Sequence, residues 1–220
     1  MRLPKAALFD LDGVIFDTEC QYDVFWGAQC RKYHPEHPGL EQEIKGQTLV
    51  QIFDRHFSGD DMAGVREQIT AGLNDFEAQM SYDYLPGFEA FVADLRRHGV
   101  KTAVVTSSNR PKMESVYHAR PGFPHLFDAI LTSEDFTESK PSPQCYLRAA
   151  ERVGAMREES VVFEDSINGL RSGQAAKMFV VGLVTTNPLE KVAPLSDVQI
   201  NDFQRMDYTT LCTLFNSGAI

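Results

Sequence analysis

Short apolar runs alternate with amphipathic segments over much of the chain, and this alternation predicts strands and helices in turn. The runs are rich in Val, Ile, Leu and Phe, which is typical of strands buried on both faces of a parallel sheet. They cover residues 6–9, 102–106, 129–132, 160–163 and 179–183. Helical periodicity appears at residues 88–98, 112–120, 143–153, 167–176 and 208–216. We therefore expect an α/β fold with a doubly wound, Rossmann-like parallel sheet.

The alternation fails between residues 17 and 84, where only helical patterns occur. One group of apolar residues there recurs at steps of three and four, which places it on one helix face: Met62, Val65, Ile69, Leu73, Phe76 and Met80. A second group near residues 22–29 predicts another helix. A block of this length cannot be a loop of a sheet. We expect residues 17–84 to be an all-helical domain inserted into an α/β core of residues 1–16 and 85–220.

Composition and charge restrict the classes of partner. The hydrophobic share of 43% and the charged share of 24% are close to globular averages, so the whole chain should fold. The net charge of −10 repels nucleic acid, and no basic run with interleaved aromatics offsets it. The same charge repels a small phosphorylated ligand. Any phosphate site must therefore carry its own cation, either a metal ion or a local Lys or Arg.

The cysteines and the N-terminus give an expectation about location. The four cysteines are isolated and form no Cys-x-x-Cys pair, which favours reduced structural thiols: Cys20, Cys30, Cys145 and Cys212. The first residues resemble neither a signal peptide nor a membrane span. We expect a cytoplasmic protein without a membrane partner, and the sequence leaves its oligomeric state open.

Polar residues end four of the predicted strands. In an open α/β sheet, ligands bind outside the carboxyl ends of the strands. The residues there are Asp10-Leu11-Asp12, Thr106-Ser107-Ser108-Asn109, Lys140-Pro141 and Glu164-Asp165-Ser166. Each group alone could be a turn or a helix cap. Together they would crowd four carboxylates at one edge of the sheet, which is unfavourable unless a cation neutralises them or some hold protons.

A magnesium ion resolves this crowding. Mg²⁺ takes oxygen ligands and readily bridges carboxylates and phosphate. The candidate metal ligands are Asp10, Asp12, Glu164 and Asp165. Neither Cys nor His occurs in these groups, which argues against zinc.

The four groups resemble, in order, the sequence motifs of the haloacid dehalogenase superfamily. The motif residues are Phe9 to Val14, Thr106-Ser107-Ser108, Lys140-Pro141 and Glu164-Asp165-Ser166. The helical segment after the first motif is similar to the helical cap of the branch that contains β-phosphoglucomutases and sugar-phosphate phosphatases. The resemblance extends over nearly the whole chain and implies the α/β core with an inserted cap.

The resemblance also implies roles for the motif residues. Asp10 would attack phosphorus and form an aspartyl phosphate. Asp12 would protonate the leaving oxygen and then deprotonate water, so its side chain must start protonated. Asp12 would bind the metal ion through its backbone carbonyl instead of its side chain. Thr106 and Ser107, together with Lys140, would hold the oxygens of the phosphoryl group as it is transferred.

The remaining candidate residues are assigned less directly. Asp165 would bind Mg²⁺ through its side chain, and Glu164 either directly or through water. Ser108 and Thr18 are further candidates for substrate binding. Thr18 matches the family's entry to the cap, but it could equally be the N-cap of the first helix of the insert.

The expected function is magnesium-dependent hydrolysis of a small phosphorylated metabolite, with a sugar phosphate as the expected substrate. Asp12 favours phosphoryl transfer, because true dehalogenases of the superfamily lack this second acid. The runner-up is a β-phosphoglucomutase-type mutase. Those enzymes carry a His and an Arg in the cap where this chain has Tyr22 and Leu49. A non-catalytic phosphate sensor is the alternative outside enzymes, and it predicts a lost nucleophile or acid.

Overall fold

The computed structural model describes residues 3–59 and 62–217. Over these residues it has one sheet of six parallel strands in the order β3-β2-β1-β4-β5-β6. The strands are β1 (Ala6–Phe9), β2 (Lys101–Val105), β3 (Ala129–Leu131), β4 (Ser160–Glu164), β5 (Phe179–Leu183) and β6 (Val198–Ile200). The sheet extends one way from β1 and the other way from β4, so a topological switch point lies between these two strands. The predicted α/β fold with a Rossmann-like parallel sheet is confirmed.

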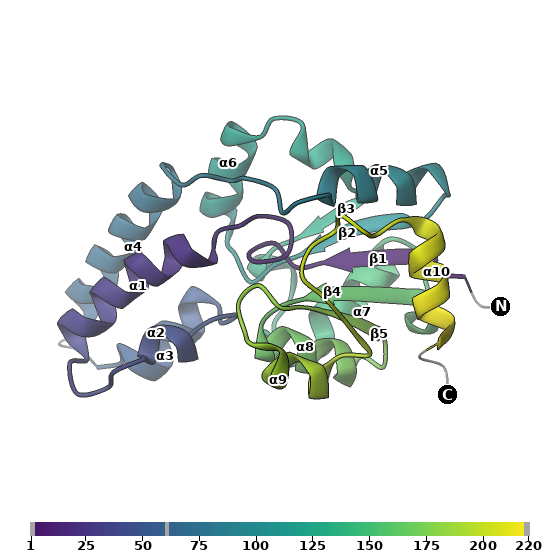
Figure 1. Ribbon diagram of the computed structural model, residues 1–220. Coiled ribbons are helices and arrows are strands. Elements are labelled where there is room, and N and C mark those ends of the chain that lie inside the picture. Colours follow the sequence, from purple (N-terminus) through teal and green to yellow (C-terminus); the bar gives the residue numbers. More distant parts are fainter. Residues whose placement is uncertain (1–2, 60–61, 218–220) are drawn as a thin grey trace.

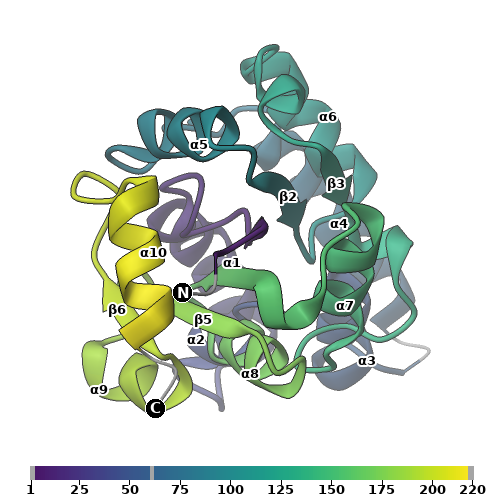
Figure 2. The same cartoon turned by 90° about the vertical axis from the view of Figure 1, so that its right-hand side faces the viewer.

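Helices cover both faces of the sheet. They are α5 (Phe88–Arg97), α6 (Arg110–Ala119), α7 (Gln144–Arg152), α8 (Ile167–Ala175), α9 (Leu189–Val192) and α10 (Tyr208–Ser217). Short 3-10 turns occupy Phe123–Leu126, Ser133–Asp135, Arg157–Glu159 and Ala193–Leu195. In Figures 1 and 2, α5 and α10 lie on one side of the sheet and α7 and α8 on the other.

The alternation of side chains along β1 explains this arrangement. Ala7 and Phe9 belong to the hydrophobic cluster under α5 and α10, whereas Ala6 and Leu8 belong to the cluster under α7 and α8. The Phe9 ring stacks on Phe163 of β4 with 4.6 Å between ring centroids. The central strands are thus buried on both faces, as their apolar runs predict.

Four further helices lie to one side of the sheet (Figure 1). They are α1 (Glu19–Tyr33), α2 (Leu40–Glu43), α3 (Leu49–His56) and α4 (Ala63–Glu77), and we call the segment that they span the helical insert. Its interior is a hydrophobic cluster of its own, which includes Trp26, Ile52 and Leu73. Helices α1 and α4 correspond to the helices expected near residues 22–29 and 62–80. Helices α2 and α3 were not predicted from the sequence.

The two chain segments that connect the insert to the rest of the protein run side by side. Phe16 and Tyr84 form an antiparallel bridge. Asp17 N–H donates to Asp83 O at 2.9 Å, and Leu85 N–H donates to Ile15 O at 2.9 Å. Among the described residues, no helix has the length and apolar character needed to cross a membrane.

Candidate active site

The candidate site lies where β1, β2 and β4 end. Phe9 is in register with Val104 of β2 and with Phe163 of β4, so the residues that follow these strands start at one level. Asp10 N–H continues the pairing by donating to Phe163 O at 3.0 Å. A cavity of about 960 Å³ opens at this edge and is lined both by these strand ends and by the helical insert.

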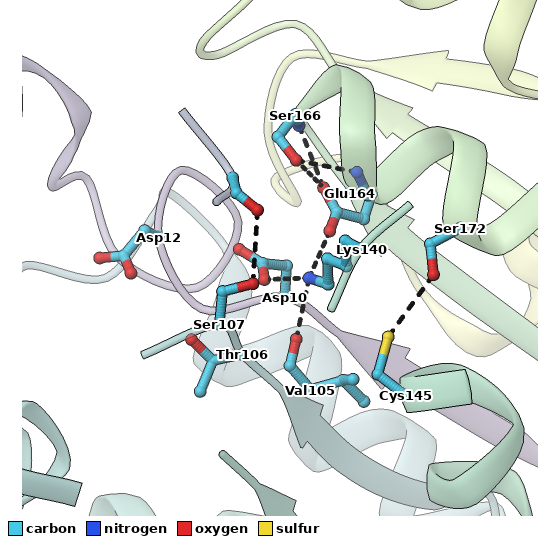
Figure 3. Close-up of polar contacts among 12 residues, drawn as sticks. Asp10, Asp12, Val105, Thr106, Ser107, Lys140, Cys145, Glu164, Ser166 and Ser172 are labelled. Atoms are coloured by element: carbon cyan, nitrogen blue, oxygen red, sulfur yellow. Dashed lines mark hydrogen bonds and ion pairs between the residues drawn. The ribbon is translucent and has the colours of Figure 1, made fainter. Parts of the chain in front are cut away.

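Lys140 lies at the centre of the site. Its ammonium donates to Asp10 Oδ1 at 2.5 Å, to Glu164 Oε1 at 2.5 Å and to Val105 O at 3.1 Å (Figure 3). The side chain is 1% exposed. Burial lowers the pKa of Lys140, but the charges of Asp10 and Glu164 outweigh that effect and hold the pKa above its usual value. Lys140 is therefore a permanent cation beside Asp10.

Glu164 has both carboxylate oxygens occupied by donors of the protein. Besides Lys140, Tyr146 Oη donates to Oε1 at 2.9 Å. Oε2 accepts from the N–H groups of Asp165 and Ser166, each at 3.0 Å, and from Ser166 Oγ at 3.1 Å. A Cβ added at Gly169 would lie 1.7 Å from Oε1, so only glycine fits there. Glu164 thus fixes the loop that carries Asp165.

Asp165 has one oxygen to offer. Its Oδ2 accepts from Thr186 Oγ1. Its Oδ1 is buried and has no hydrogen-bond partner in the described part of the chain. One oxygen from each of Asp10, Glu164 and Asp165 lies within 4.8 Å of the others. A buried carboxylate oxygen without a donor, beside two more carboxylates, fits a hard divalent cation.

The electrostatics of the cluster agree with this geometry. Burial, together with the charges of Glu164 and Asp12, raises the pKa of Asp10 to about 7 against the opposing charge of Lys140. Burial likewise raises the pKa of Asp165 well above its usual value, together with the charges of Glu19 and Glu164. The ammonium of Lys140 alone does not balance the three carboxyl groups of Asp10, Glu164 and Asp165, so the site can accept a further cation.

Asp12 lies apart from the Lys140 contacts (Figure 3) and faces the helical insert. Its Oδ1 accepts from Thr18 Oγ1 at 2.6 Å. Its Oδ2 accepts from Ser108 Oγ at 3.3 Å and from the ammonium of Lys112. Thr18 makes no side-chain cap for α1, so its hydroxyl serves Asp12 and not the helix.

Thr106 and Ser107 of the second motif lie beside Asp10 (Figure 3). Thr106 is 1% exposed, and its Oγ1 accepts from Ser108 N–H at 3.0 Å, which fixes the loop after β2. Ser107 Oγ donates to Gly46 O of the helical insert at 3.4 Å. Thr106, Ser107 and Ser108 all line the cavity.

Four site residues were missed from the sequence. Thr186 and Asn187 hold Asp165, the latter by donating from Nδ2 to Asp165 O at 3.0 Å. They follow β5, so listing the residues after that strand too would have found them. Tyr146 lies in α7, 18 residues from Glu164, and Lys112 lies in α6, 100 residues from Asp12. No local pattern marks either residue.

Comparison with known proteins identifies the family of the chain. The family model described as haloacid dehalogenase-like hydrolase matches residues 7–183. The chain belongs to this family and is a hydrolase.

Two curated relatives that the chain resembles are named as phosphatases. It is 28% identical to validoxylamine A 7'-phosphate phosphatase of Streptomyces hygroscopicus subsp. limoneus over 90% of this chain and 93% of that protein. It is 29% identical to hexitol phosphatase A of Escherichia coli, covering 81% and 82%.

A solved structure matches the fold over almost its full length. The β-phosphoglucomutase of Clostridium difficile superposes with a TM-score of 0.80, covering 98% of each chain, at 20% sequence identity. At that identity the match supports the fold, and the chemistry has to be argued from the site.

Proposed function

We propose that this chain is a magnesium-dependent phosphatase that hydrolyses a small phosphate monoester, a sugar phosphate, through an aspartyl phosphate on Asp10. The observation that carries the proposal is the buried Lys140 bound to both Asp10 and Glu164, next to the unpartnered Oδ1 of Asp165. The chain is a phosphoric monoester hydrolase. Relatives named as phosphatases of a hexitol and of a 7'-phosphate support a small phosphorylated substrate.

The geometry supports a two-step reaction. A carboxylate oxygen of Asp10 attacks phosphorus, and the new bond forms as the ester P–O bond breaks. The leaving oxygen takes a proton from Asp12, which then accepts a proton from the water that hydrolyses the aspartyl phosphate. Thr106, Ser107 and Lys140 lie around Asp10 (Figure 3) and would stabilise the phosphoryl oxygens, and Ser108 supports Asp12.

Asp10 and Asp165 would hold the magnesium ion, whose charge draws the phosphate into an acidic site. The backbone carbonyl of Asp12 completes the protein ligands of this proposal. Glu164 fits contact through water better than a direct bond, since both of its oxygens already accept hydrogen bonds.

We expect removal of Mg²⁺ to abolish turnover and Mg²⁺ binding to stabilise the fold. At about 100 times the dissociation constant, binding contributes about 2.7 kcal/mol, which raises Tm by about 5–10 °C for a chain of this size. Asp165→Asn should lose both the activity and the Tm shift, whereas the exposed Asp75→Asn should keep both. Measurements are phosphate release and thermal melts with EDTA and with added Mg²⁺. An unchanged Tm shift in Asp165→Asn would remove Asp165 from the ligand set.

We also infer that residues 17–84 form a cap domain and residues 1–16 and 85–220 the core. The separate hydrophobic cluster of the helical insert and its two paired connections support this division. Residues 1–2, 60–61 and 218–220 of these ranges lie outside the described residues. The cavity between the strand ends and the insert is where a substrate would be enclosed.

Contacts in the helical insert favour a phosphatase over a mutase. A mutase must hold the second phosphate of a bisphosphate intermediate, for which an Arg is the favoured residue. Leu49 offers no charge in the cavity. Lys45, the nearest substitute, is bound to Glu19 at 3.1 Å and to Asp23 at 2.8 Å. The hydroxyl of Tyr22 donates its hydrogen bond to Glu77 Oε1 at 2.8 Å, so it is not free to donate to a second phosphate.

We therefore expect phosphate release to exceed isomerisation. The enzyme is incubated with β-glucose 1-phosphate, Mg²⁺ and a trace of glucose 1,6-bisphosphate, and free phosphate and glucose 6-phosphate are followed together. Fast formation of glucose 6-phosphate with little free phosphate would establish the mutase.

Two assays test the wider proposal. Hydrolysis of p-nitrophenyl phosphate with Mg²⁺ separates an enzyme from a non-catalytic phosphate sensor, which would bind phosphate and release no nitrophenol. A panel of sugar phosphates and other small phosphate esters, ranked by kcat/KM, then identifies the substrate class.

A further inference from the structure

Lys112 is a buried ammonium that the motif residues do not account for. It lies in the first turn of α6, where its N–H donates to Oδ1 of the N-cap residue Asn109 at 3.1 Å. Its side chain is only 2% exposed. A buried ammonium is unfavourable unless it is paired, so its contacts determine why it is there.

On the core side, Lys112 completes the set of donors around Asp12. Thr18 holds Oδ1, and Lys112 and Ser108 share Oδ2. The three donors come from three segments: the connection to the insert, the loop after β2 and helix α6. Without Lys112, Oδ2 would keep only the hydroxyl of Ser108 at 3.3 Å, which is a weak contact.

On the other side, Lys112 meets the helical insert. Its Nζ lies 4.6 Å from the centroid of the Tyr22 ring, within the range of a cation–π interaction. Tyr22 in turn donates to Glu77. Burial raises the pKa of Glu77, and the charge of Lys112 acts against that effect. Lys112 therefore contacts the insert while it holds Asp12.

We propose that Lys112 is a positioning residue, resting on the phosphatase function proposed above: it anchors Oδ2 of Asp12, so that Oδ1 is the oxygen that carries the proton toward the leaving group, and the Tyr22 ring keeps Lys112 in place while the insert covers the site. A misplacement of a catalytic group by about 1 Å can cost about 10²-fold in rate. The cost falls on the step in which Asp12 acts, which is proton donation to the leaving group.

Dependence on the leaving group separates this role from a purely structural one. Phenyl phosphate and p-nitrophenyl phosphate are similar in size, but phenolate needs a proton on departure far more than nitrophenolate does. We expect Lys112→Met to lower kcat/KM for phenyl phosphate at least about tenfold more than for p-nitrophenyl phosphate. Both constants are measured on one sample, so their ratio does not depend on the fraction of the variant that is folded. Lys112→Arg should recover part of the loss.

Matched variants complete the test. Lys101→Met, which changes a lysine that is 53% exposed, should leave the ratio unchanged. Tyr22→Phe keeps a ring over Lys112 and should stay near the wild-type ratio, whereas Tyr22→Leu should move toward Lys112→Met. Equal losses on both substrates in Lys112→Met, or no loss, would overturn the assignment of Lys112. If the wild type hydrolyses neither ester with Mg²⁺, the phosphatase proposal fails instead.

Discussion

Replacing Asp10 with Asn is expected to lower kcat by more than about 10⁴-fold, the scale seen when a catalytic nucleophile is removed. The amide neither attacks phosphorus nor provides a charged oxygen for a metal ion. The fold should survive, because Asn has the same shape and Lys140 keeps its contacts with Glu164 and Val105 O.

Phosphate release and a thermal melt of the same preparation measure the two effects. Trapping of an acid-stable phosphoryl group on the wild type, and its absence in Asp10→Asn, would identify the acceptor. Asp17→Asn, at an exposed position nearby, is the control and should keep wild-type turnover. A folded Asp10→Asn that retained substantial turnover would show that the nucleophile is another residue.

Asp12→Ala is expected to have the second largest effect, and the effect should depend on the substrate. A sugar alkoxide needs a proton as it leaves, so its hydrolysis should fall by about 10²–10⁴-fold, the usual contribution of a general acid. Nitrophenolate leaves without a proton. The first step should therefore survive with p-nitrophenyl phosphate, and the phosphoenzyme should accumulate because its hydrolysis lacks a base.

Rapid-mixing measurement of nitrophenol gives the result directly: a burst close to one equivalent of enzyme, followed by a slow steady rate. A sugar phosphate should give no comparable burst of released alcohol. If both substrates lost their bursts to the same extent, an acid role for Asp12 would be excluded.

The sequence predicted elements best where burial alone decides the structure. The strands expected at residues 6–9 and 179–183 have the observed bounds, since each is an uninterrupted apolar run with another strand on either side. Strand β6, Val198–Ile200, was missed because it is three residues long, half-buried and has Gln199 at its centre. Helix α3 was also missed, although Thr48 and Gln51 form a capping box that the sequence displays.

A similar division applies to the candidate site. Asp10 and Asp165 were predicted from their places directly after β1 and β4, because neighbouring parallel strands bring their carboxyl ends together. Lys140 lies well after the edge strand β3, so its contact with Asp10 depends on the loop between them. The contact between Asp12 and Lys112 was not predicted. Lys112 is 100 residues away in sequence, and its position in α6 resembles any helix surface position until tertiary packing buries it. Tertiary contacts of this kind are set by how the insert meets the core, which no local pattern encodes.

The paired connections of the helical insert determine how it can move. Their bridge at Phe16 and Tyr84 is continued by Gln21, which accepts from Ser81 N–H at 3.0 Å and donates to Ser81 O at 2.9 Å. Sliding one segment along the other would break all of these bonds together, whereas bending the pair breaks none. The insert would therefore rotate about a single hinge. Bending at this hinge would displace the far end of the insert and change access to the cavity.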